Sequence, residues 1–377
     1  MKFSKICIFD PGYYEKTLGG AEVQLFILAD KLVEDGCKVV YLTGDFDEQT
    51  VYKGIEFIPF KKKKRGSILN LLYFLRKLKR VDADLYIQRG RKQETFFLGL
   101  FSYIFKKQSV FFISMDIDCD KFKFRKLWRN SRNFIKPFVV DISTSWGMKK
   151  ISLIIAQTKF QQSKLKRKLS LNSVVLSNMH NLSQYQETEK DKIVLWVANM
   201  KEWKRPELFL ELAQRLKNTD LKFWMIGALN TNYKNIIDRT EKENKNFKYW
   251  GSIPFDQISK YYENASVFVN TSLSNEGFPN SFIQAWASRC LVVSLSFDPD
   301  SLLHKNGFGI FCNGNFNDLQ ETIVKYSRDN RTAHKIIENA HNYVLNEFSI
   351  ENKIKDFYDL LDKAFIKNEK DSKIPSI

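Results

Sequence analysis

Short runs of strand-forming residues alternate with amphipathic helical segments along almost the whole chain. The runs occupy residues 5–9, 38–42, 55–60, 85–87, 110–114, 153–155, 174–176, 193–198, 223–226, 247–250, 267–269 and 291–295. Alternation of this kind is typical of parallel α/β folds, in which each helix returns the chain to the same edge of a sheet. The pattern predicts an α/β protein built from two Rossmann-like domains whose parallel sheets face a central cleft.

The length of 377 residues exceeds what one ordinary core organises and favours two domains. A polar stretch at 181–191 lies between two complete strand–helix runs and is typical of a linker. We therefore predict an N-terminal domain at 1–183 and a C-terminal domain at 184–349. A final helix with a frayed, Lys-rich end is predicted for 350–377.

Cysteine spacing and hydropathy exclude several other classes of protein. The five cysteines are dispersed without any CxxC spacing, which argues against a disulfide framework or a zinc site and fits a reducing cytosol. Residues 6–9 are too short a run for a signal peptide and read as a first strand. The most apolar stretch, 96–105, has about half the length needed to span a bilayer, so a buried helix followed by a strand is predicted.

A loop and helix start near residue 280 have the composition of a cradle for an anionic, hydroxyl-rich ligand. The segment consists of Glu276, Gly277, Phe278, Pro279, the helix-capping Asn280 and Ser281. The backbone N–H groups of Ser281 and Phe282 would face a phosphate at the helix N-terminus. Glu276 would accept hydrogen bonds from hydroxyl groups, and Gln284 would bind a second set.

A second candidate site follows the strand at 193–198, where Asn199 leads to Lys204, Arg205 and Pro206. Proline is favourable near the first position of a helix, so the two cations would lie where the strand ends and the helix begins. Cations placed there suit a diphosphate leaving group. A solvated basic turn is the alternative interpretation.

A third candidate is the pair Gly19 and Gly20, which follows the first strand and precedes an amphipathic helix. Paired glycines permit close approach of a ligand to the backbone at a helix start. The segment matches neither the dinucleotide fingerprint nor a P-loop. A tight turn that merely requires glycine explains it equally well.

These three segments together resemble the family 4 retaining glycosyltransferases of GT-B fold, over nearly the whole chain. The family typically has a Gly-Gly-Ala-Glu start, as at 19–22, and a lysine before the first helix of the second domain, as at Lys204. Its acids spaced eight apart match Glu276 and Gln284, and Asn178 falls at its Pro-Asn-Gly turn. The closing segment resembles the family tail, which crosses back onto the first domain.

The chain departs from the family pattern at three places. The second acid of the pair is Gln284, which can still bond ribose hydroxyls. The usual Gly-Arg at the strand end is Ala198-Asn199, which leaves Lys204 and Arg205 to stabilise the diphosphate. The family histidine after a first-domain strand is replaced, so Asp116 or Asp118 would contact the sugar instead.

The resemblance implies transfer of a sugar from a UDP- or GDP-linked donor to an acceptor hydroxyl with retention. Glu276 and Lys204 would be the catalytic pair; the implied donor-binding residues are Gly19, Gly20, Asn199, Arg205, Gly277, Phe278, Pro279, Asn280, Ser281 and Gln284. No cofactor and no metal is implied, because cations and helix dipoles stabilise the leaving group. A nucleotide-sugar epimerase and an inactive relative that binds a partner enzyme are the alternatives.

The formal net charge of +17 predicts an anionic partner. Residues 61–80 combine a basic run with an apolar stripe, as in helices that lie on membranes, and 121–129 form a second basic-aromatic patch. We predict a cytoplasmic protein, peripheral at the inner face of the membrane, acting on a lipid-linked or surface glycan. No nucleic-acid motif is present. A helix that packs its stripe on a sheet, and a Lys-rich composition without function, are the alternatives.

Overall fold

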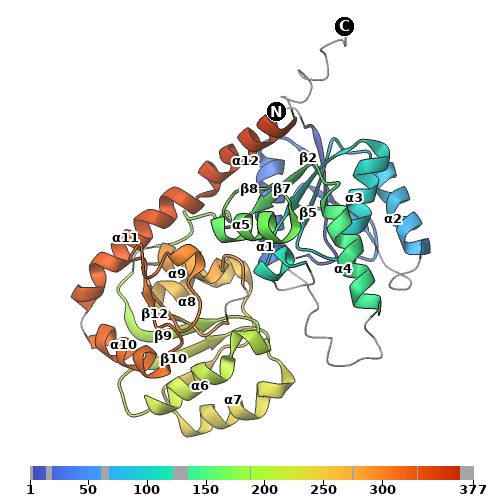
Figure 1. Cartoon of the computed structure of the whole chain (residues 1–377). Coiled ribbons are helices and arrows are strands. Elements are labelled where there is room, and N and C mark those ends of the chain that lie inside the picture. The colour runs from blue at the N-terminus through green and yellow to red at the C-terminus, as the bar shows by residue number, and fades with distance from the viewer. Residues whose placement is uncertain are drawn as a thin grey trace. The chain divides into compact units, whose positions relative to one another are not determined.

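The computed structural model describes residues 3–13, 19–60, 68–121, 135–186, 188–273, 276–328 and 330–365 (Figure 1). The chain divides into two compact units, one formed by residues 1–179 with 350–377 and the other by His180–Ser349. We call them unit 1 and unit 2. The predicted Lys61–Arg65 run, most of the 121–129 patch and the chain end after 365 lie outside the described residues.

Unit 1 is built on an eight-stranded sheet of order β3-β4-β2-β1-β5-β6-β7-β8, parallel except for β3. Its strands are β1 (Lys5–Phe9), β2 (Lys38–Thr43), β3 (Thr50–Tyr52), β4 (Ile55–Pro59), β5 (Leu85–Arg89), β6 (Gln108–Phe112), β7 (Leu153–Ala156) and β8 (Val174–Val175). Its helices are α1 (Gly20–Glu34), α2 (Ile68–Val81), α3 (Gln93–Phe105), α4 (Ile135–Met148), α5 (Lys159–Leu169) and α12 (Ile350–Phe365).

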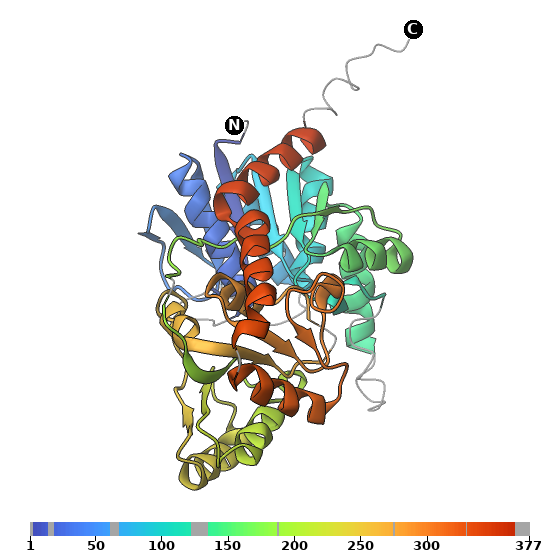
Figure 2. The same ribbon diagram turned by 90° about the vertical axis from the view of Figure 1, so that its left-hand side faces the viewer.

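Helices cover both faces of this sheet. Phe74 of α2 and Phe101 of α3 pack into a core with Tyr86 of β5 and Phe111 of β6. The next residue of β6, Phe112, points to the opposite face and contacts Phe357 of α12, which runs across that face in Figure 2. The central strands of unit 1 are therefore buried on both sides, as is usual for parallel sheets.

Two glycines allow α3 and α4 to approach closely. A Cβ at Gly99 would overlap the carbonyl oxygen of Gly147, and a Cβ at Gly147 would lie 2.5 Å from the carbonyl oxygen of Thr95. Both positions are therefore restricted to glycine by backbone contact rather than by backbone conformation. The crossing fixes α4 beside α3 on one face of the sheet.

Unit 2 is built on a six-stranded parallel sheet of order β11-β10-β9-β12-β13-β14. Its strands are β9 (Asp191–Val197), β10 (Lys222–Ile226), β11 (Phe247–Tyr249), β12 (Ala265–Asn270), β13 (Leu291–Ser294) and β14 (Ile310–Phe311). Its helices are α6 (Pro206–Arg215), α7 (Thr231–Glu243), α8 (Ser259–Asn264), α9 (Asn280–Ala287), α10 (Phe316–Arg328) and α11 (Asn330–Phe348).

Alternate residues of the strands supply the two cores of unit 2. In β9, Ile193 and Leu195 pack with α8, α9 and the end of α11, while Val194 and Trp196 pack with α6, α7 and α10. Period-two alternation of apolar side chains is expected for a strand that is buried on both faces. The predicted fold class is confirmed, and every predicted strand is present with small shifts of its ends.

The structure corrects one prediction about α2. Its apolar stripe is not available to a membrane, because Phe74, Leu78 and Val81 are buried in the core and Leu71 and Leu75 pack against it. The alternative interpretation, an ordinary helix that packs its stripe on the sheet, is therefore correct for this helix.

Candidate active site

The site in unit 2 lies where the strand order reverses. The chain enters the sheet at β9, adds β10 and β11 on one side, and then adds β12 on the other side of β9. Ligands of open α/β sheets bind outside the carboxyl ends of the strands at such a switch point. Here the connections that follow β9 and β12 carry Lys204 and Glu276.

The turn that carries Lys204 is fixed by hydrogen bonds to the connection after β12. The Thr271 hydroxyl donates to the Lys204 carbonyl at 2.6 Å and accepts from the indole N–H of Trp196 at 2.9 Å. The Leu273 N–H donates to the Trp203 carbonyl at 2.8 Å. Because two of these hydrogen bonds join the two connections and the third joins Thr271 to β9, the Lys204 backbone is held in one place relative to β12.

Arg205 occupies a left-handed conformation, with φ of 51°, between the 3₁₀ turn Glu202–Lys204 and α6. Pro206 then begins α6, as its fixed φ favours. A non-glycine residue in this region costs about 1 kcal/mol or more, which local contacts must offset. The left-handed residue turns the chain sharply from the Lys204 turn into the helix.

Lys204 and Glu276 form an ion pair between Nζ and Oε1. The side chain of Glu276 is 8% exposed and that of Lys204 is 20% exposed, so the pair is largely withdrawn from water. The other carboxylate oxygen of Glu276, Oε2, is buried, and no described residue donates a hydrogen bond to it. An unsatisfied buried oxygen of this kind costs about 1–3 kcal/mol, which a ligand hydroxyl that donates to it would recover.

The start of α9 differs in detail from the sequence prediction. The N-cap is Pro279, and Asn280 is the first helical residue. The N–H of Phe282 donates to the Pro279 carbonyl at 3.1 Å, so it is engaged within the turn and does not face a ligand. Gly277, Phe278 and Ser281 lie around this turn, with Phe278 buried against the aromatic core of unit 2.

His180 lies against the same turn, and the sequence patterns did not predict it as a residue of the site. Its ring Nε2 lies 3.4 Å from Asn280 Oδ1, and its backbone N–H donates to the Phe348 carbonyl at 2.8 Å. The side chain is fully buried, and this burial lowers the pKa of His180 to about 4. The imidazole is therefore neutral in the folded protein at neutral pH.

The buried His180 predicts a pH dependence of stability. Since its pKa is about 4 in the folded protein and 6.5 in the unfolded chain, the unfolded chain binds the extra proton between those values. The free energy of unfolding is therefore expected to fall as the pH drops through this window, by up to about 3 kcal/mol. Urea unfolding of the wild-type and His180→Gln proteins at about pH 7 and about pH 4.5 measures it.

The wild type should lose about 2 kcal/mol more than the variant between these pH values. Asp10, whose pKa is raised to about 6 by burial, gives an effect of opposite sign that both proteins share. Equal pH dependence of the two proteins would contradict the assignment of His180 as a buried neutral imidazole.

Gln284 lies on the buried side of α9. It lies near the hydroxyl of Tyr185, whose pKa is raised by burial, while Gln184 and Gln284 oppose the shift. The predicted contact of Gln284 with ribose hydroxyls stays a prediction. The Gln284 side chain is buried within unit 2.

Asn199 belongs to a loop that is closed by backbone contacts with Gly227. The Ala228 N–H donates to Asn199 Oδ1 at 3.4 Å, and the Ala198 N–H donates to the Ile226 carbonyl at 3.0 Å. Gly227 has φ of 149°, and a Cβ there would overlap the carbonyl oxygen of Ala198. The close approach of these two strand ends therefore requires glycine at 227.

Unit 1 has its own ion pair at its own switch point, between β1 and β5. Lys92 Nζ lies 2.7 and 3.0 Å from the two carboxylate oxygens of Asp10 and 3.8 Å from Glu22 Oε1. Asp10 is fully buried, and desolvation raises its pKa to about 6 even though Lys92 lowers it. Each unit thus places a lysine–carboxylate pair beyond the ends of its central strands.

The structure gives Gly19 a more local role than the predicted approach of a ligand. Gly19 is the N-cap of α1 in an extended conformation, and a Cβ there would overlap Oε2 of Glu22. The carboxylate of Glu22, which is the end of a flexible side chain, thus folds back over Gly19. Gly20 is the first residue of α1. The donor-binding role of both glycines stays a prediction.

Arg89 is a further residue that sequence reasoning missed. It ends β5, is fully buried, and donates from Nη2 to Asn178 Oδ1 at 2.6 Å. Burial lowers its pKa to about 10, while Glu22, Asp118 and Asp10 raise it. Arg89 follows one predicted strand, and its partner Asn178 is a polar residue that follows another. These two positions are the signal that could have identified Arg89.

Asp116 and Asp118 are both engaged within unit 1. Asp116 Oδ1 accepts from the Gln161 amide at 2.9 Å. Asp118 Oδ2 accepts from the backbone N–H groups of Ser114 and Met115 at 3.1 and 3.0 Å. Both acids are buried, so here they stabilise the connection after β6, and their predicted contact with a sugar stays a prediction.

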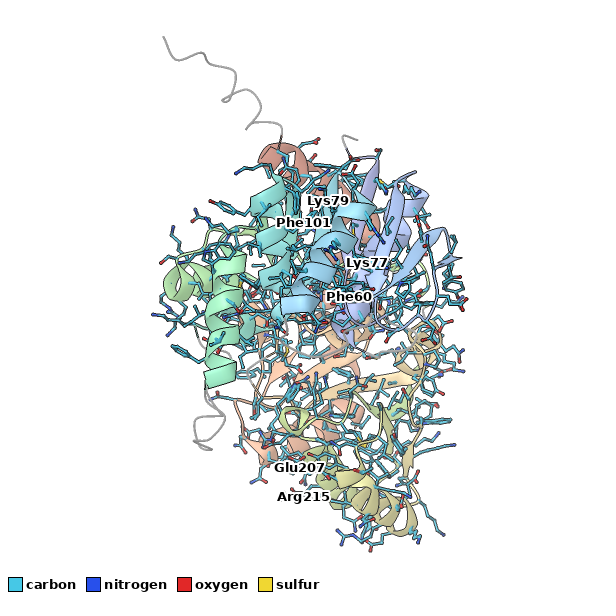
Figure 3. The ribbon with its side chains drawn as sticks, turned by 90° about the vertical axis from the view of Figure 1, so that its right-hand side faces the viewer. Phe60, Lys77, Lys79, Phe101, Glu207 and Arg215 are labelled. Carbon is cyan, nitrogen blue, oxygen red and sulfur yellow. The ribbon has the colours of Figure 1, made fainter. Side chains whose placement is uncertain are left out.

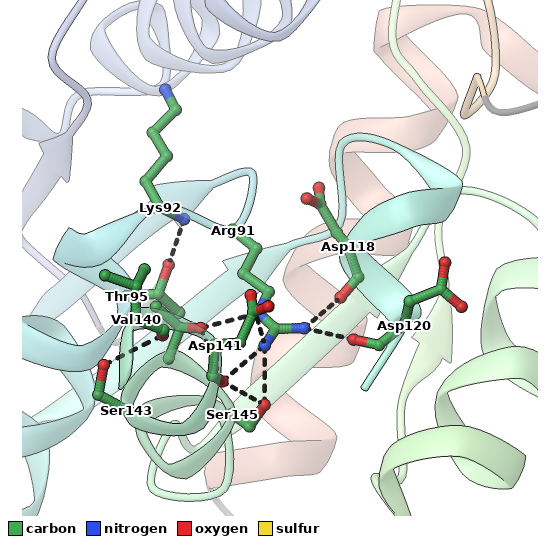
Figure 4. Close-up of polar contacts among 10 residues, drawn as sticks. Arg91, Lys92, Thr95, Asp118, Asp120, Val140, Asp141, Ser143 and Ser145 are labelled. Atoms are coloured by element: carbon green, nitrogen blue, oxygen red, sulfur yellow. Dashed lines mark hydrogen bonds and ion pairs between the residues drawn. The ribbon is translucent and has the colours of Figure 1, made fainter. Parts of the chain in front are cut away.

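Arg91 holds this connection to α4, as Figure 4 shows. Its guanidinium donates to the Asp120 carbonyl at 2.6 Å, the Asp141 carbonyl at 2.7 Å, the Thr144 hydroxyl at 2.9 Å and the Ser145 hydroxyl at 2.8 Å. Burial lowers the pKa of Arg91, and its neighbouring carboxylates oppose the shift. Arg91 therefore has a structural role.

Within the described parts of the chain, no group of three or more His, Cys, Asp or Glu side chains is arranged to hold a metal ion. In the same residues, no helix has both the length and the apolar character needed to cross a membrane.

The fold of the chain is that of the GT-B glycosyltransferases. The solved structure of Anabaena Alr3699/HepE in complex with UDP and glucose matches with a TM-score of 0.74 at 15% identity, covering 96% of this chain and 100% of that one. Sucrose-phosphate synthase from Thermosynechococcus elongatus matches with a TM-score of 0.75 at 14% identity, covering 97% and 100%. These similarities establish the fold.

Part of the sequence is similar to a family of glycosyltransferases. Residues 180–343 match the family model described as Glycosyl transferases group 1. An uncharacterized glycosyltransferase, MJ1069 of Methanocaldococcus jannaschii, is 21% identical over 96% of this chain and 99% of its own length. The chain is therefore similar to group 1 glycosyltransferases over residues 180–343 and to one glycosyltransferase over most of its length.

Proposed function

We propose that the chain transfers a sugar from a nucleotide-diphosphate sugar to an acceptor hydroxyl, with retention of anomeric configuration. Unit 2 would bind the donor at the connections after β9 and β12. Glu276 would bind hydroxyl groups of the donor sugar, while Lys204 and Arg205 would stabilise the diphosphate as it leaves.

The observation that carries this proposal is the state of Glu276. Its Oε1 is held by Lys204, whereas Oε2 is buried without a partner among the described residues. The ion pair therefore orients the carboxylate and leaves one oxygen for an incoming hydroxyl donor. A sugar hydroxyl is the natural occupant because it can donate to Oε2 and accept from a neighbouring group.

The class of donor is supported by the relatives. The Anabaena structure was obtained with UDP and glucose, and a second crystal of the same protein contained UDP-glucose. We propose UDP or GDP as the nucleotide part. The acceptor is proposed to be a lipid-linked or surface glycan, which would place the enzyme at the inner face of a membrane.

Calorimetry with the full chain tests the donor site. UDP, GDP, UDP-glucose and GDP-mannose are titrated separately into the wild type and into Glu276→Gln. One nucleotide family should bind the wild type, and the variant should weaken binding of the sugar-linked form more than binding of the free diphosphate, because Glu276 is assigned to the sugar. Failure of every nucleotide to bind the wild type would overturn the proposal. Retention is tested separately, by the anomeric configuration of the product in proton NMR.

A further inference from the structure

One face of unit 1 is formed by α2, α3 and α4, with α3 lying between the other two helices in Figures 1 and 3. The close contact of Gly99 and Gly147 holds α3 and α4 together, and α2 packs beside α3 on the same core. We call the outward side of these helices, with residues 106–107 and 149–150 at their ends, the three-helix face. Figure 3 looks onto this face and labels Lys77 and Lys79 on α2.

The three-helix face exposes large apolar side chains on each helix. These side chains are between 38 and 56% exposed: Leu72 and Tyr73 on α2, Tyr103 and Ile104 on α3, and Val139 and Ile142 on α4. Exposed apolar residues are ordinary when they are scattered singly, but clusters on neighbouring elements mark interaction sites. The exposed side of α2 is distinct from its buried apolar stripe.

The charges on this face are almost entirely positive. The acids within the three helices, Glu94 and Asp141, are both buried. Asp82, in the connection after α2, is paired with Lys107 at 2.7 Å. The exposed cations of the face are Arg76, Lys79, Arg80, Lys106 and Lys149. A partner of this surface must therefore be anionic.

The cations and the aromatic rings are interleaved. Lys150 Nζ lies 4.5 Å from the centre of the Tyr103 ring, and Lys106 Nζ lies 5.1 Å from the same ring. Lys77 Nζ lies 5.6 Å from the ring of Tyr73. Tyrosine rings with lysines beside them suit the boundary between lipid head groups and acyl chains, where the ring is partly buried and the ammonium reaches phosphate.

The Lys-rich composition of the chain does not give every helix this pattern. Helix α7 has three cations, Lys234, Arg239 and Lys242, but they are interspersed with three acids, Asp238, Glu241 and Glu243. Its surface is therefore mixed in charge, unlike the three-helix face. Cations are thus separated from acids on the three-helix face and also on α5, which has five cations and no acid, but not on α7.

We infer that the three-helix face docks on an anionic lipid bilayer. This inference names the surface responsible for the membrane association proposed above, and it replaces the apolar stripe of α2 in that role. The apolar side chains would enter the head-group region, while the cations would bind lipid phosphates. Binding to vesicles requires no nucleotide, so its failure would leave the donor-site tests unaffected.

Vesicle co-sedimentation of the full chain tests the inference. The vesicles contain either phosphatidylcholine alone or an equimolar mixture with phosphatidylglycerol. A charge variant combines Arg76→Gln, Arg80→Gln and Lys149→Gln, and an apolar variant combines Tyr103→Ser with Ile104→Ser. The matched control carries Lys234→Gln, Arg239→Gln and Lys242→Gln on α7. Circular dichroism melting verifies that each variant is folded.

The wild type and the α7 control should bind the phosphatidylglycerol vesicles and not the neutral ones. The charge variant should lose about 100-fold in its partition coefficient. The apolar variant should also bind more weakly, because it retains the charge but not the side chains that enter the head groups. Equal binding by the charge variant and the α7 control would overturn the inference. The inference would also be overturned if the apolar variant bound the vesicles as well as the wild type does and if single-stranded RNA displaced the wild type from them. These two results together would indicate a general polyanion site.

Discussion

Replacing Glu276 with glutamine is expected to reduce the rate of sugar transfer by about 100- to 1,000-fold while the protein stays folded. Glutamine keeps an oxygen that can accept from Lys204, but it removes the charge that pairs with Nζ and replaces one carboxylate oxygen with an amide donor. The variant therefore cannot accept a hydrogen bond from a hydroxyl group at the position of Oε2 while the other oxygen faces Lys204. Release of the nucleotide diphosphate from the donor that binds best measures the loss.

Glu211→Gln is the matched control for this variant. Glu211 is an exposed acid on α6 that pairs with Arg215 at 2.6 Å, so its replacement changes the same functional group without touching the site. The control should retain the wild-type rate. A Glu276→Gln protein that is as active as Glu211→Gln would show that Glu276 does not contact the donor during transfer.

The second large effect is expected on stability, from Gly227→Ala. The new Cβ would overlap the carbonyl oxygen of Ala198, and the backbone φ of 149° disfavours any L side chain. Because backbone atoms cannot move away as a flexible side chain does, we expect a loss of about 3–5 kcal/mol in the free energy of unfolding. Urea unfolding followed by tryptophan fluorescence measures it.

Gly251→Ala separates the overlap from the effect of backbone conformation. Gly251 also has a positive φ, of 72°, but a Cβ there would meet nothing within 4 Å. Its replacement should cost only about 1–2 kcal/mol, the conformational penalty alone. Equal losses in the two variants would mean that the connection after β9 relaxes away from position 227 at little cost.

The sequence predicted those parts of the site that follow strands and contain residues typical of turns. Lys204 and Glu276 were both identified because each follows an apolar run and precedes a helix start. Their direct pairing follows from the strand order, which places β9 beside β12 although β10 and β11 intervene in the chain. Periodicity predicts strands but not which strands are neighbours.

The residues that were missed have partners far away in the chain. Asp10 pairs with Lys92, 82 residues later, and Arg89 donates to Asn178, 89 residues later. Neither pair has a local spacing that sequence patterns can detect. Both pairs were detectable only through the fold, because all four residues follow predicted strands and the carboxyl ends of parallel strands meet at one sheet edge.

The apolar stripe of α2 shows a second limit of prediction from sequence: one pattern can be compatible with two structures. A cationic helix with an apolar stripe has the same sequence pattern whether the stripe packs on a sheet or lies in a membrane. The structure places Phe74 and Leu78 in the core, and this tertiary packing decides between the two.

The position of α12 has a consequence for synthesis of the chain on the ribosome. This last helix completes the core of unit 1, where Phe357 contacts Phe112 and Phe365 contacts Phe3. All of unit 2 is translated before α12 emerges, so unit 2 can finish folding while one face of the unit 1 sheet is still uncovered. The usual order, in which the N-terminal part folds first, is therefore reversed here for the final step. During that interval, chaperones would be expected to bind the uncovered face of the nascent chain.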